Sequence, residues 1–244
     1  MIEDGRLPKE RAGTVILLPL LAQGFTRLYL CRHGQTDYNY TRKLQGRGIN
    51  TILNDTGREQ AANLAEATRD LPLTAIISSA LARAQETAQI VANTHPNLCV
   101  QSFPELEEMS YGQFEGQGHE KHHGFHSIVK EWRFGHYDKR FPGGECPIDV
   151  IARGNPKIED IMRQAAAQDH IMIVAHGRFN KIILSQCLYG NLEHMHEFEQ
   201  ENTCVNVLDY DRESQTYEEV VINSVKHLPR QLTSDDRQHQ IALR

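Results

Sequence analysis

Short apolar segments alternate with amphipathic helical patterns along most of the chain, and no other feature of the sequence restricts its fold as strongly. The run from Arg27 to Arg32 is apolar and aromatic, as in a buried strand. The segment that opens at Thr56 has Glu59 three residues later, the pattern of a capping box, and it continues at helical spacing until Pro72. The expected strands are 27–32, 74–79, 98–103 and 171–175, the expected helices are 56–71, 81–93, 156–168 and 179–189, and a late hairpin is expected from 204–210 and 217–221.

Strands that alternate with helices predict a three-layer α/β sandwich, in which a central, mainly parallel sheet is flanked by helices. In such sheets the functional groups gather at the carboxyl ends of the strands. His33 directly follows the first expected strand, and His176 directly follows the strand that ends at residue 175. Arg83 falls in the first helical turn after the second strand. We therefore expect these three residues, which are distant in the chain, to lie at one edge of the sheet.

The chain is expected to form one such domain at residues 27–228, since 244 residues suffice for an α/β domain with a substantial core. An N-terminal extension (1–26) precedes the domain and a flexible, polar C-terminal tail (229–244) follows it. Within the domain, the periodicity is weak over residues 117–145. We expect a lid or inserted loop there, with a short helix around 128–134.

Composition limits the kinds of partner. The chain has 26 basic and 32 acidic residues and a formal net charge of −6, which gives no electrostatic reason to expect a nucleic acid or an anionic membrane. An anionic substrate would need a local cluster of arginines. The five cysteines form no CxxC pair and indicate a reducing compartment. A cytoplasmic location is therefore expected, although three basic residues in the N-terminal extension leave organelle targeting open. The sequence indicates no oligomeric state.

The most specific motif is the run RHGQT at residues 32–36, followed by Asn39. A short motif such as RHG occurs by chance, but several ordered blocks in fitting structural contexts do not. The later blocks are LQG at 44–46, SSALARAQETA at 78–88, LEEMSYGQFEG at 106–116 and AHG at 175–177. In this order they resemble the histidine phosphatase superfamily, which includes the cofactor-dependent phosphoglycerate mutases. The resemblance covers residues 27–228.

This resemblance implies phosphoryl transfer through a phosphohistidine on His33, and it implies neither a metal nor a cofactor. A neutral imidazole is nucleophilic near pH 7 and can split one hard displacement into two easier steps. Arg32 and Arg83 would bind the phosphoryl oxygens with planar, permanently charged guanidinium groups. Glu108 matches the general acid, and His176 would complete the phosphate site. The expected phosphate-binding residues are Arg32, Asn39, Gln45, Gly46, Arg83, His176 and Gly177.

Some of these residues have a purely structural alternative. A lone histidine at a strand end is usually structural, so His33 gains weight only from its companions. Arg83 could simply be solvated, but a cation in a first helical turn opposes the helix dipole, and an anionic partner is the better interpretation. Glu107 could be mistaken for the acid, and the spacing to Gly112 favours Glu108.

Two further features lie outside this core motif set. Histidines 119, 122, 123 and 126 have near-helical spacing, but a zinc site would need a closed ligand set with supporting carboxylates, so we expect a solvated lid instead. Arg178 stands where many family members have a small residue, and Lys181 where an arginine is common. Arg178 would either add a cation for a second acidic group on the substrate or point to solvent.

The segment between Glu108 and His176 separates two kinds of activity. Mutases carry a longer insertion there with further basic residues, whereas PGGE at 142–145, with Arg153 further on, resembles phosphatase branches. We therefore expect a phosphomonoester phosphatase that acts on a small phosphorylated metabolite, whose identity the sequence leaves open. The alternatives are mutase-type phosphoryl transfer and a non-catalytic phosphate-binding module.

Overall fold

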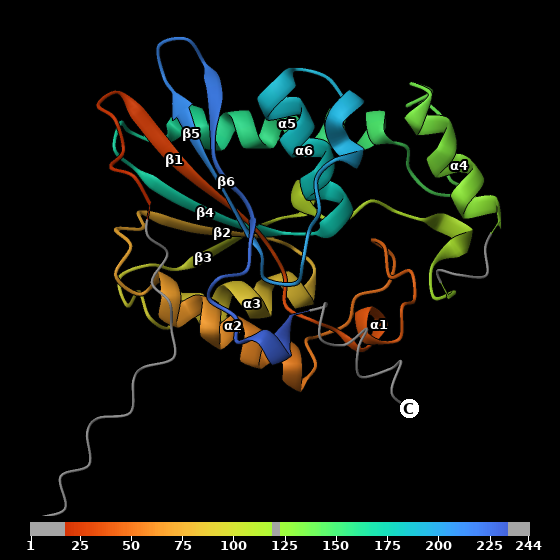
Figure 1. The fold of residues 1–244 in the computed structure, drawn as a ribbon, viewed down its shortest axis with the longest axis horizontal. Coiled ribbons are helices and arrows are strands. Elements are labelled where there is room, and N and C mark those ends of the chain that lie inside the picture. Colours follow the sequence, from red (N-terminus) through yellow and green to blue (C-terminus); the bar gives the residue numbers. More distant parts are fainter. Residues whose placement is uncertain (1–17, 119–122, 234–244) are drawn as a thin grey trace, which may run out of the picture.

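A mixed β-sheet between two layers of helices organises the computed structural model of the chain, which describes residues 18–118 and 123–233 (Figure 1). The strands are β1 (Phe25–Arg32), β2 (Ala75–Ser79), β3 (Val100–Phe103), β4 (His170–Ala175), β5 (Val205–Asp211) and β6 (Thr216–Ser224). Their order in the sheet is β3-β2-β4-β1-β5-β6. Strands β1 to β4 are parallel, whereas β5 and β6 form an antiparallel edge. The expected α/β sandwich is confirmed, with the late hairpin as this edge.

Helices cover both faces of the sheet (Figure 1). Helices α2 and α3 pack on one face and α5 and α6 on the other, while α4 stands apart beyond the sheet. A one-turn helix, α1, follows β1. The bounds of the helices are α1 (Asp37–Tyr40), α2 (Asp55–Thr68), α3 (Ala82–Ala92), α4 (His123–Arg133), α5 (Pro147–Gln164) and α6 (Gly177–Tyr189).

The central strand β1 is buried on both faces. Successive side chains of a strand point to opposite sides, so Leu28 and Leu30 join the apolar cluster on the α5–α6 side. Tyr29 and Cys31 join the cluster on the α2–α3 side. Burial on both faces explains why this strand is a continuous apolar run instead of an alternating one.

Two helices begin at other residues than the sequence indicates. Helix α2 is capped by Asn54, whose side-chain oxygen accepts a hydrogen bond from the Gly57 N–H at 2.9 Å, and not by Thr56. Helix α5 begins at Pro147, well before the predicted start, and holds Pro156 in its interior. Asparagine caps a helix as well as threonine does, and proline fits the first turn at either position. Local signals therefore could not decide between neighbouring candidates.

The described part of the segment 117–145 has more regular structure than a loop with one short helix. Helix α4 begins at His123, earlier than predicted, and turns Phe125 and Trp132 inward. Phe141 stacks on Phe125 with 4.9 Å between ring centroids and meets Trp132 edge-on at 5.0 Å. These three fully buried rings anchor the helix to the domain. Of the histidines noted in the sequence, those at 119 and 122 lie outside the described residues.

One buried histidine predicts how the fold responds to acid. His227 is 2% exposed and contacts the Thr203 hydroxyl at 3.2 Å. Burial lowers its pKa to about 4, from an ordinary value of 6.5. Between pH 6.5 and 4, His227 therefore binds a proton in the unfolded chain but not in the folded chain. The stability that comes from this group is present above pH 6.5 and is lost as the pH falls towards 4. We expect the wild type to lose about 2 kcal/mol more than His227→Gln between about pH 6.5 and 5, at ~1.4 kcal/mol per pH unit. Urea unfolding at both pH values measures this difference, and parallel losses would contradict it.

Within the two described ranges, no helix is both long enough and apolar enough to cross a lipid bilayer.

Candidate active site

Three parallel strands end side by side at one edge of the sheet. The register pairs Arg32 of β1 with Ala175 of β4, and Val174 of β4 with Ser78 of β2. The residues that follow these strand ends therefore meet. The imidazole rings of His33 and His176 are 5.1 Å apart between centroids. The structure thus brings the sequence-predicted residues to the edge where they were expected.

His33 is held as a neutral imidazole with one defined tautomer. The residue is 3% exposed, and its Nδ1 lies 2.6 Å from the carbonyl oxygen of Gly34. A carbonyl oxygen only accepts, so Nδ1 carries the proton and Nε2 keeps a free lone pair. Burial, together with the positive charges of Arg83 and Arg32, holds the pKa of His33 well below its usual value. The imidazole is therefore unprotonated at neutral pH, as a nucleophile must be.

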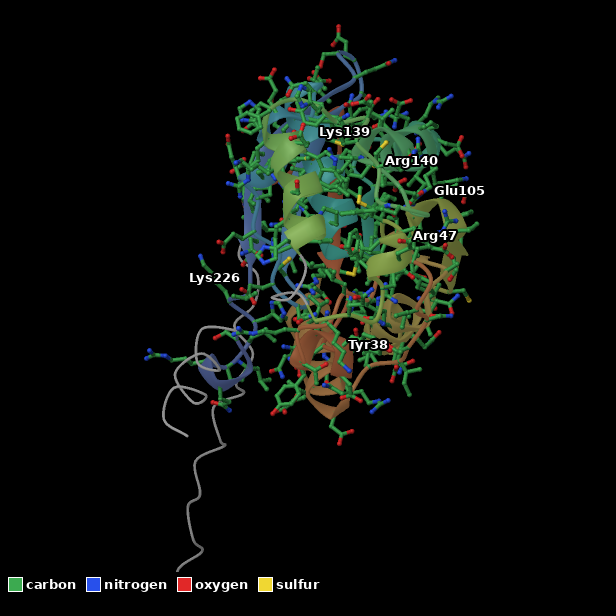
Figure 2. The ribbon with its side chains drawn as sticks, turned by 90° about the vertical axis from the view of Figure 1, so that its right-hand side faces the viewer. Tyr38, Arg47, Glu105, Lys139, Arg140 and Lys226 are labelled. Atoms are coloured by element: carbon green, nitrogen blue, oxygen red, sulfur yellow. The ribbon has the colours of Figure 1, made fainter. Side chains whose placement is uncertain are left out.

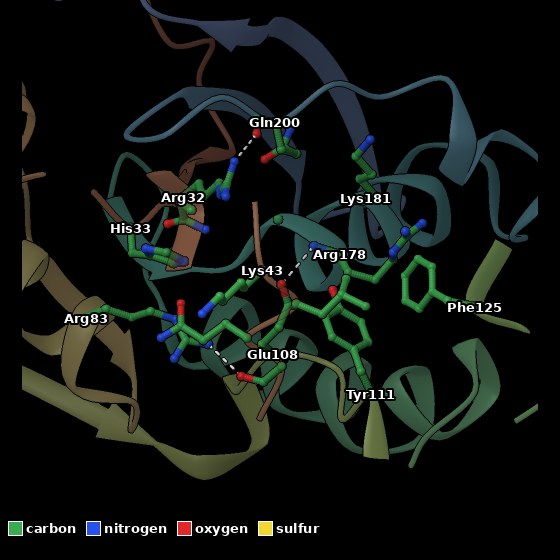
Figure 3. A pocket seen from close by; sticks show the side chains of 15 residues that line it. Arg32, His33, Lys43, Arg83, Glu108, Tyr111, Phe125, Arg178, Lys181 and Gln200 are labelled. Atoms are coloured by element: carbon green, nitrogen blue, oxygen red, sulfur yellow. Dashed lines mark hydrogen bonds between the residues drawn. The ribbon is translucent and has the colours of Figure 1, made fainter. Parts of the chain in front are cut away.

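Two arginines flank the His33 ring (Figure 3). Arg83 is 1% exposed and donates to the carbonyl oxygens of Ile49 at 3.0 Å and Gly46 at 2.9 Å. Arg32 donates to the Gln200 carbonyl at 2.5 Å. The Nε atoms of both guanidinium groups are buried and find no hydrogen-bond partner among the described residues. Burial lowers the pKa of Arg83 to about 10, which still leaves it charged. These unpaired, charged donors suit an anion beside His33.

The loop after β1 supplies neutral hydrogen-bonding groups. Asn39 and Gln45 both line the cavity, and the Thr36 hydroxyl donates to Gln45 Oε1 at 3.0 Å, which fixes the amide. Gly46 has φ of 62°, and a β-carbon there would lie 2.3 Å from Glu115 Oε1. Only glycine fits this tight, left-handed position. In the LQG block, Gly46 is therefore needed for its backbone conformation and Gln45 for its side-chain amide.

His176 lies beside His33 but does not itself line the cavity, so its part in phosphate binding stays a prediction. It is completely buried, whereas Gly177 lines the cavity. Its Nε2 lies 2.7 Å from the Ser79 hydroxyl, which itself accepts from the Leu81 N–H at 3.2 Å. The hydroxyl proton is thus available to Nε2, which leaves the imidazole proton on Nδ1, a buried atom without a partner in the described part of the chain. Burial and the charge of Arg83 keep the pKa of His176 well below its ordinary value.

The Glu108 carboxylate lies at the N-terminus of α6. Oε1 accepts from the N–H groups of Met109 and Phe179, both at 2.9 Å. Within the described part of the chain, Oε2 accepts from the Arg178 N–H alone, at 3.1 Å. The residue is 7% exposed and lines the cavity. Because Oε2 has one partner fewer, it is the oxygen that can carry and transfer a proton.

Arg153 fixes the backbone that presents Glu108. Its guanidinium donates to the carbonyl oxygens of Glu107 and Glu108 at 2.8 and 3.1 Å, and Nε donates to Glu145 at 2.8 Å. Glu145 belongs to the PGGE segment. This segment therefore does more than form a turn, because it supplies the carboxylate that binds Arg153. Arg47, on the loop after β1, pairs with Glu107 at 2.5 Å. Figure 2 shows Arg47 on the same face of the molecule as Arg140, which shortly precedes this segment.

These groups surround a cavity of about 280 Å³ (Figure 3). Among the described residues, its charged lining comprises five cations and the single carboxylate of Glu108. The cations are Arg32, Lys43, Arg83, Arg178 and Lys181. Such a site attracts a small, strongly anionic molecule. Within residues 18–118 and 123–233, no group of three or more His, Cys, Asp or Glu side chains is arranged to hold a metal ion.

Four lining residues were not predicted from the sequence. Lys43, Tyr111, Phe125 and Gln200 come from separate segments and line the same cavity. Lys43 directly precedes the LQG block, so its position next to a recognised motif could have indicated it. Phe125 and Gln200 have no such signal, because only the tertiary fold brings α4 and the segment before β5 to the site.

Comparison with known proteins agrees with this geometry. Residues 28–223 match the family model described as the histidine phosphatase superfamily, branch 1. The chain therefore belongs to this superfamily, and its enzyme class is that of phosphomonoester hydrolases. It is 28% identical to the uncharacterized phosphatase PhoE of Bacillus subtilis over 207 residues, which cover 82% of this chain and 96% of PhoE.

Two further relatives show the range of activities around this fold. The chain is 32% identical to the probable phosphoglycerate mutase GpmB of Enterobacter, covering 62% of this chain and 69% of that one. The solved structure of mycobacterial glucosyl-3-phosphoglycerate phosphatase superposes with a TM-score of 0.72 at 26% identity, covering 82% of this chain and 99% of that one.

Proposed function

We propose that this phosphatase hydrolyses a small phosphomonoester through a covalent phosphoryl intermediate on Nε2 of His33. The observation that carries the proposal is the hydrogen bond between His33 Nδ1 and the Gly34 carbonyl, since it leaves Nε2 unprotonated in a ring flanked by two arginines. A buried, neutral imidazole among cations has little structural purpose but suits attack on phosphorus.

In the first step, Nε2 of His33 attacks the phosphorus atom and the bond from phosphorus to the ester oxygen breaks. The phosphoryl group passes to nitrogen. Charge spreads over its oxygens in the transition state, where Arg32 and Arg83 stabilise it. Protonated Glu108 gives its proton from Oε2 to the leaving oxygen, so that an alcohol departs.

In the second step, water attacks the phosphorus atom of phosphohistidine. Glu108, now a carboxylate, takes a proton from the water as the bond from phosphorus to nitrogen breaks. Inorganic phosphate leaves, and Nε2 regains its lone pair. His33 and Glu108 therefore act in both steps, with Glu108 as the acid in the first and the base in the second. The overall reaction consumes water and needs no other reactant.

Mutase-type transfer is the second candidate, because one similar protein is a probable phosphoglycerate mutase. A mutase must return the phosphoryl group to its substrate before water attacks, which requires an enclosed site. The short PGGE-containing segment, tied to Arg153 through Glu145, leaves less chain to enclose the site than a longer insertion would. We therefore favour hydrolysis.

The proposal is tested by measuring phosphate release from a panel of small phosphomonoesters, with a chelator present throughout. Phosphoglycerate with trace bisphosphoglycerate is included to detect isomerisation in the same assay. Hydrolysis without isomerisation supports the proposal. Rapid isomerisation with little phosphate release would instead identify a mutase, and bound phosphate without turnover of any substrate would identify a binding module.

A further inference from the structure

Two cations lie at the end of the cavity away from the reacting histidine. Arg178 and Lys181 are three residues apart on α6, so their side chains leave the same side of the helix. Figure 3 shows both on the opposite side of the cavity from His33 and Arg83. Exposed Lys43, directly before the LQG block, also lines the cavity, and its amine points toward Arg83 (Figure 3). The mechanism above uses none of these three residues.

Arg178 and Lys181 are not neutralised by the protein. Among the described residues, no carboxylate forms an ion pair with either side chain. Glu108, the carboxylate of the cavity lining, accepts from the backbone N–H of Arg178 and not from its guanidinium. Glu199, which acts electrostatically on Lys181, is exposed. Half-buried cations that crowd one another without a counter-ion are costly unless a ligand supplies the negative charge.

The Arg178 side chain is held in place. Its guanidinium carbon lies 5.6 Å from the ring of Trp132, which is completely buried. A guanidinium over an indole gains a favourable cation–π interaction, and the buried ring cannot move away. Arg178 therefore does not extend freely into solvent, which was one of the two possibilities left open by the sequence.

The surrounding titratable groups report a strongly positive environment. Burial, Arg178 and Arg32 lower the pKa of Lys181 to about 8. Burial and the charges of Arg178, Arg133 and Lys181 lower the pKa of His196 to about 4. His196 therefore stays neutral and does not add to the charge. An acidic group placed between these cations would relieve their mutual repulsion.

We propose that Arg178 and Lys181 form a second anion subsite, which binds an additional acidic group of the substrate while Arg32 and Arg83 bind the reacting phosphate. The subsite rests on the proposed function of the His33 site. The added group is a carboxylate or a second phosphate, since either offers oxygen acceptors to a guanidinium and an ammonium. A cavity of about 280 Å³ lies below the usual range for drug-sized ligands, so the substrate is a small acid or bisphosphate.

The experiment compares three substrates that differ in one group. Glycerol phosphate has no second acidic group. Phosphoglycerate has a carboxylate where glycerol phosphate has a hydroxymethyl group, and glycerol bisphosphate has a second phosphate. The readout is kcat/KM for each acidic substrate divided by kcat/KM for glycerol phosphate, measured with the same preparation. This ratio does not depend on the fraction of folded enzyme, so a partly unfolded variant remains informative.

The test variant is the double substitution Arg178→Met and Lys181→Met, which removes both charges at similar side-chain volume. A charge-assisted hydrogen bond to each acidic group is lost, so we expect the ratio to fall about 10- to 100-fold. The matched control is Lys226→Met, because Lys226 is an exposed lysine at the surface (Figure 2) and does not line the cavity. Its ratio is expected to equal that of the wild type.

Each outcome decides the subsite. The subsite is supported if the wild type prefers one or both acidic substrates and this preference falls in the double variant. The substrate whose kcat/KM ratio falls more identifies the natural group as a carboxylate or a phosphate. Equal use of all three substrates by the wild type, or an unchanged ratio in the double variant, overturns the subsite and leaves the phosphatase proposal intact. Absence of phosphate release from every substrate would overturn both.

Discussion

The His33→Ala variant is expected to release phosphate at least about a thousandfold more slowly than the wild type, because it lacks the atom that accepts the phosphoryl group. The neighbouring imidazole of His176 cannot replace it. His176 is completely buried, and its nitrogens face Ser79 and the protein interior. Steady-state phosphate release on the best substrate of the panel measures the loss.

The control for this substitution is another histidine outside the site. His136 is exposed and contacts Glu131 at 2.7 Å, so His136→Ala is expected to keep wild-type turnover. Thermal unfolding of all three proteins shows whether removal of the buried His33 ring has unfolded the domain. A folded His33→Ala protein that retains more than about a tenth of the activity would contradict the assigned nucleophile.

The Glu108→Gln variant is expected to lose more activity on substrates whose leaving alcohol has a higher pKa. Glutamine keeps an acceptor oxygen for the α6 N–H groups but cannot donate a carboxylic proton. Loss of a general acid costs roughly a hundredfold to ten-thousandfold when the departing alkoxide needs protonation. An aryl phosphate, whose phenolate leaves without help, is expected to lose much less. The measurement is the slope of log kcat/KM against the pKa of the leaving alcohol, which becomes steeper in the variant.

The neighbouring carboxylate gives the matched control. Glu107 pairs with Arg47 and does not line the cavity. Glu107→Gln is therefore expected to cost less than about tenfold and to keep the wild-type slope. If Glu107→Gln steepened the slope while Glu108→Gln did not, the two carboxylates would have been assigned in the wrong order.

The parts of the fold that the sequence predicts are those with a local cause. Strand β1 and the strand that ends before His176 are short apolar runs, and burial on both faces alone produces that pattern. Parallel strands then bring His33 and Arg83 to one edge without any knowledge of contacts. The sequence does not predict the cap of α2 at Asn54 or the start of α5 at Pro147, because several residues in each region satisfy the same capping rules.

The parts that the sequence does not predict depend on contacts between distant segments. Helix α4 is stabilised by Phe125 and Trp132 packing on Phe141, and this packing leaves no clear periodicity in a segment with many polar residues. The crowding of Arg178 and Lys181 also depends on their neighbours. From sequence alone, Arg178 could also point to solvent, and its contacts with the buried ring of Trp132 and with Tyr111 decide its direction.

The charge of the site could not be predicted from the overall composition. The chain carries a formal net charge of −6, yet five cations and one carboxylate line the cavity. A local positive potential inside an acidic protein draws a small anion to one place while giving no broad attraction for nucleic acids or anionic surfaces. The net charge therefore gives no reason to expect a nucleic acid or an anionic membrane, whereas the local arginines favour a small anion.

The most direct test of this account is detection of the phosphoryl group on His33 during turnover. The enzyme is mixed with substrate, quenched in alkali because phosphohistidine is labile in acid, and cleaved with trypsin after Arg32 and Arg42, so that His33 begins a short peptide. We predict that this peptide gains the mass of one phosphoryl group, with fragmentation placing it on His33, and that the His33→Ala protein gains none. Phosphate release at the full rate with no phosphorylated form of this peptide would contradict the account, since water would then attack the substrate directly.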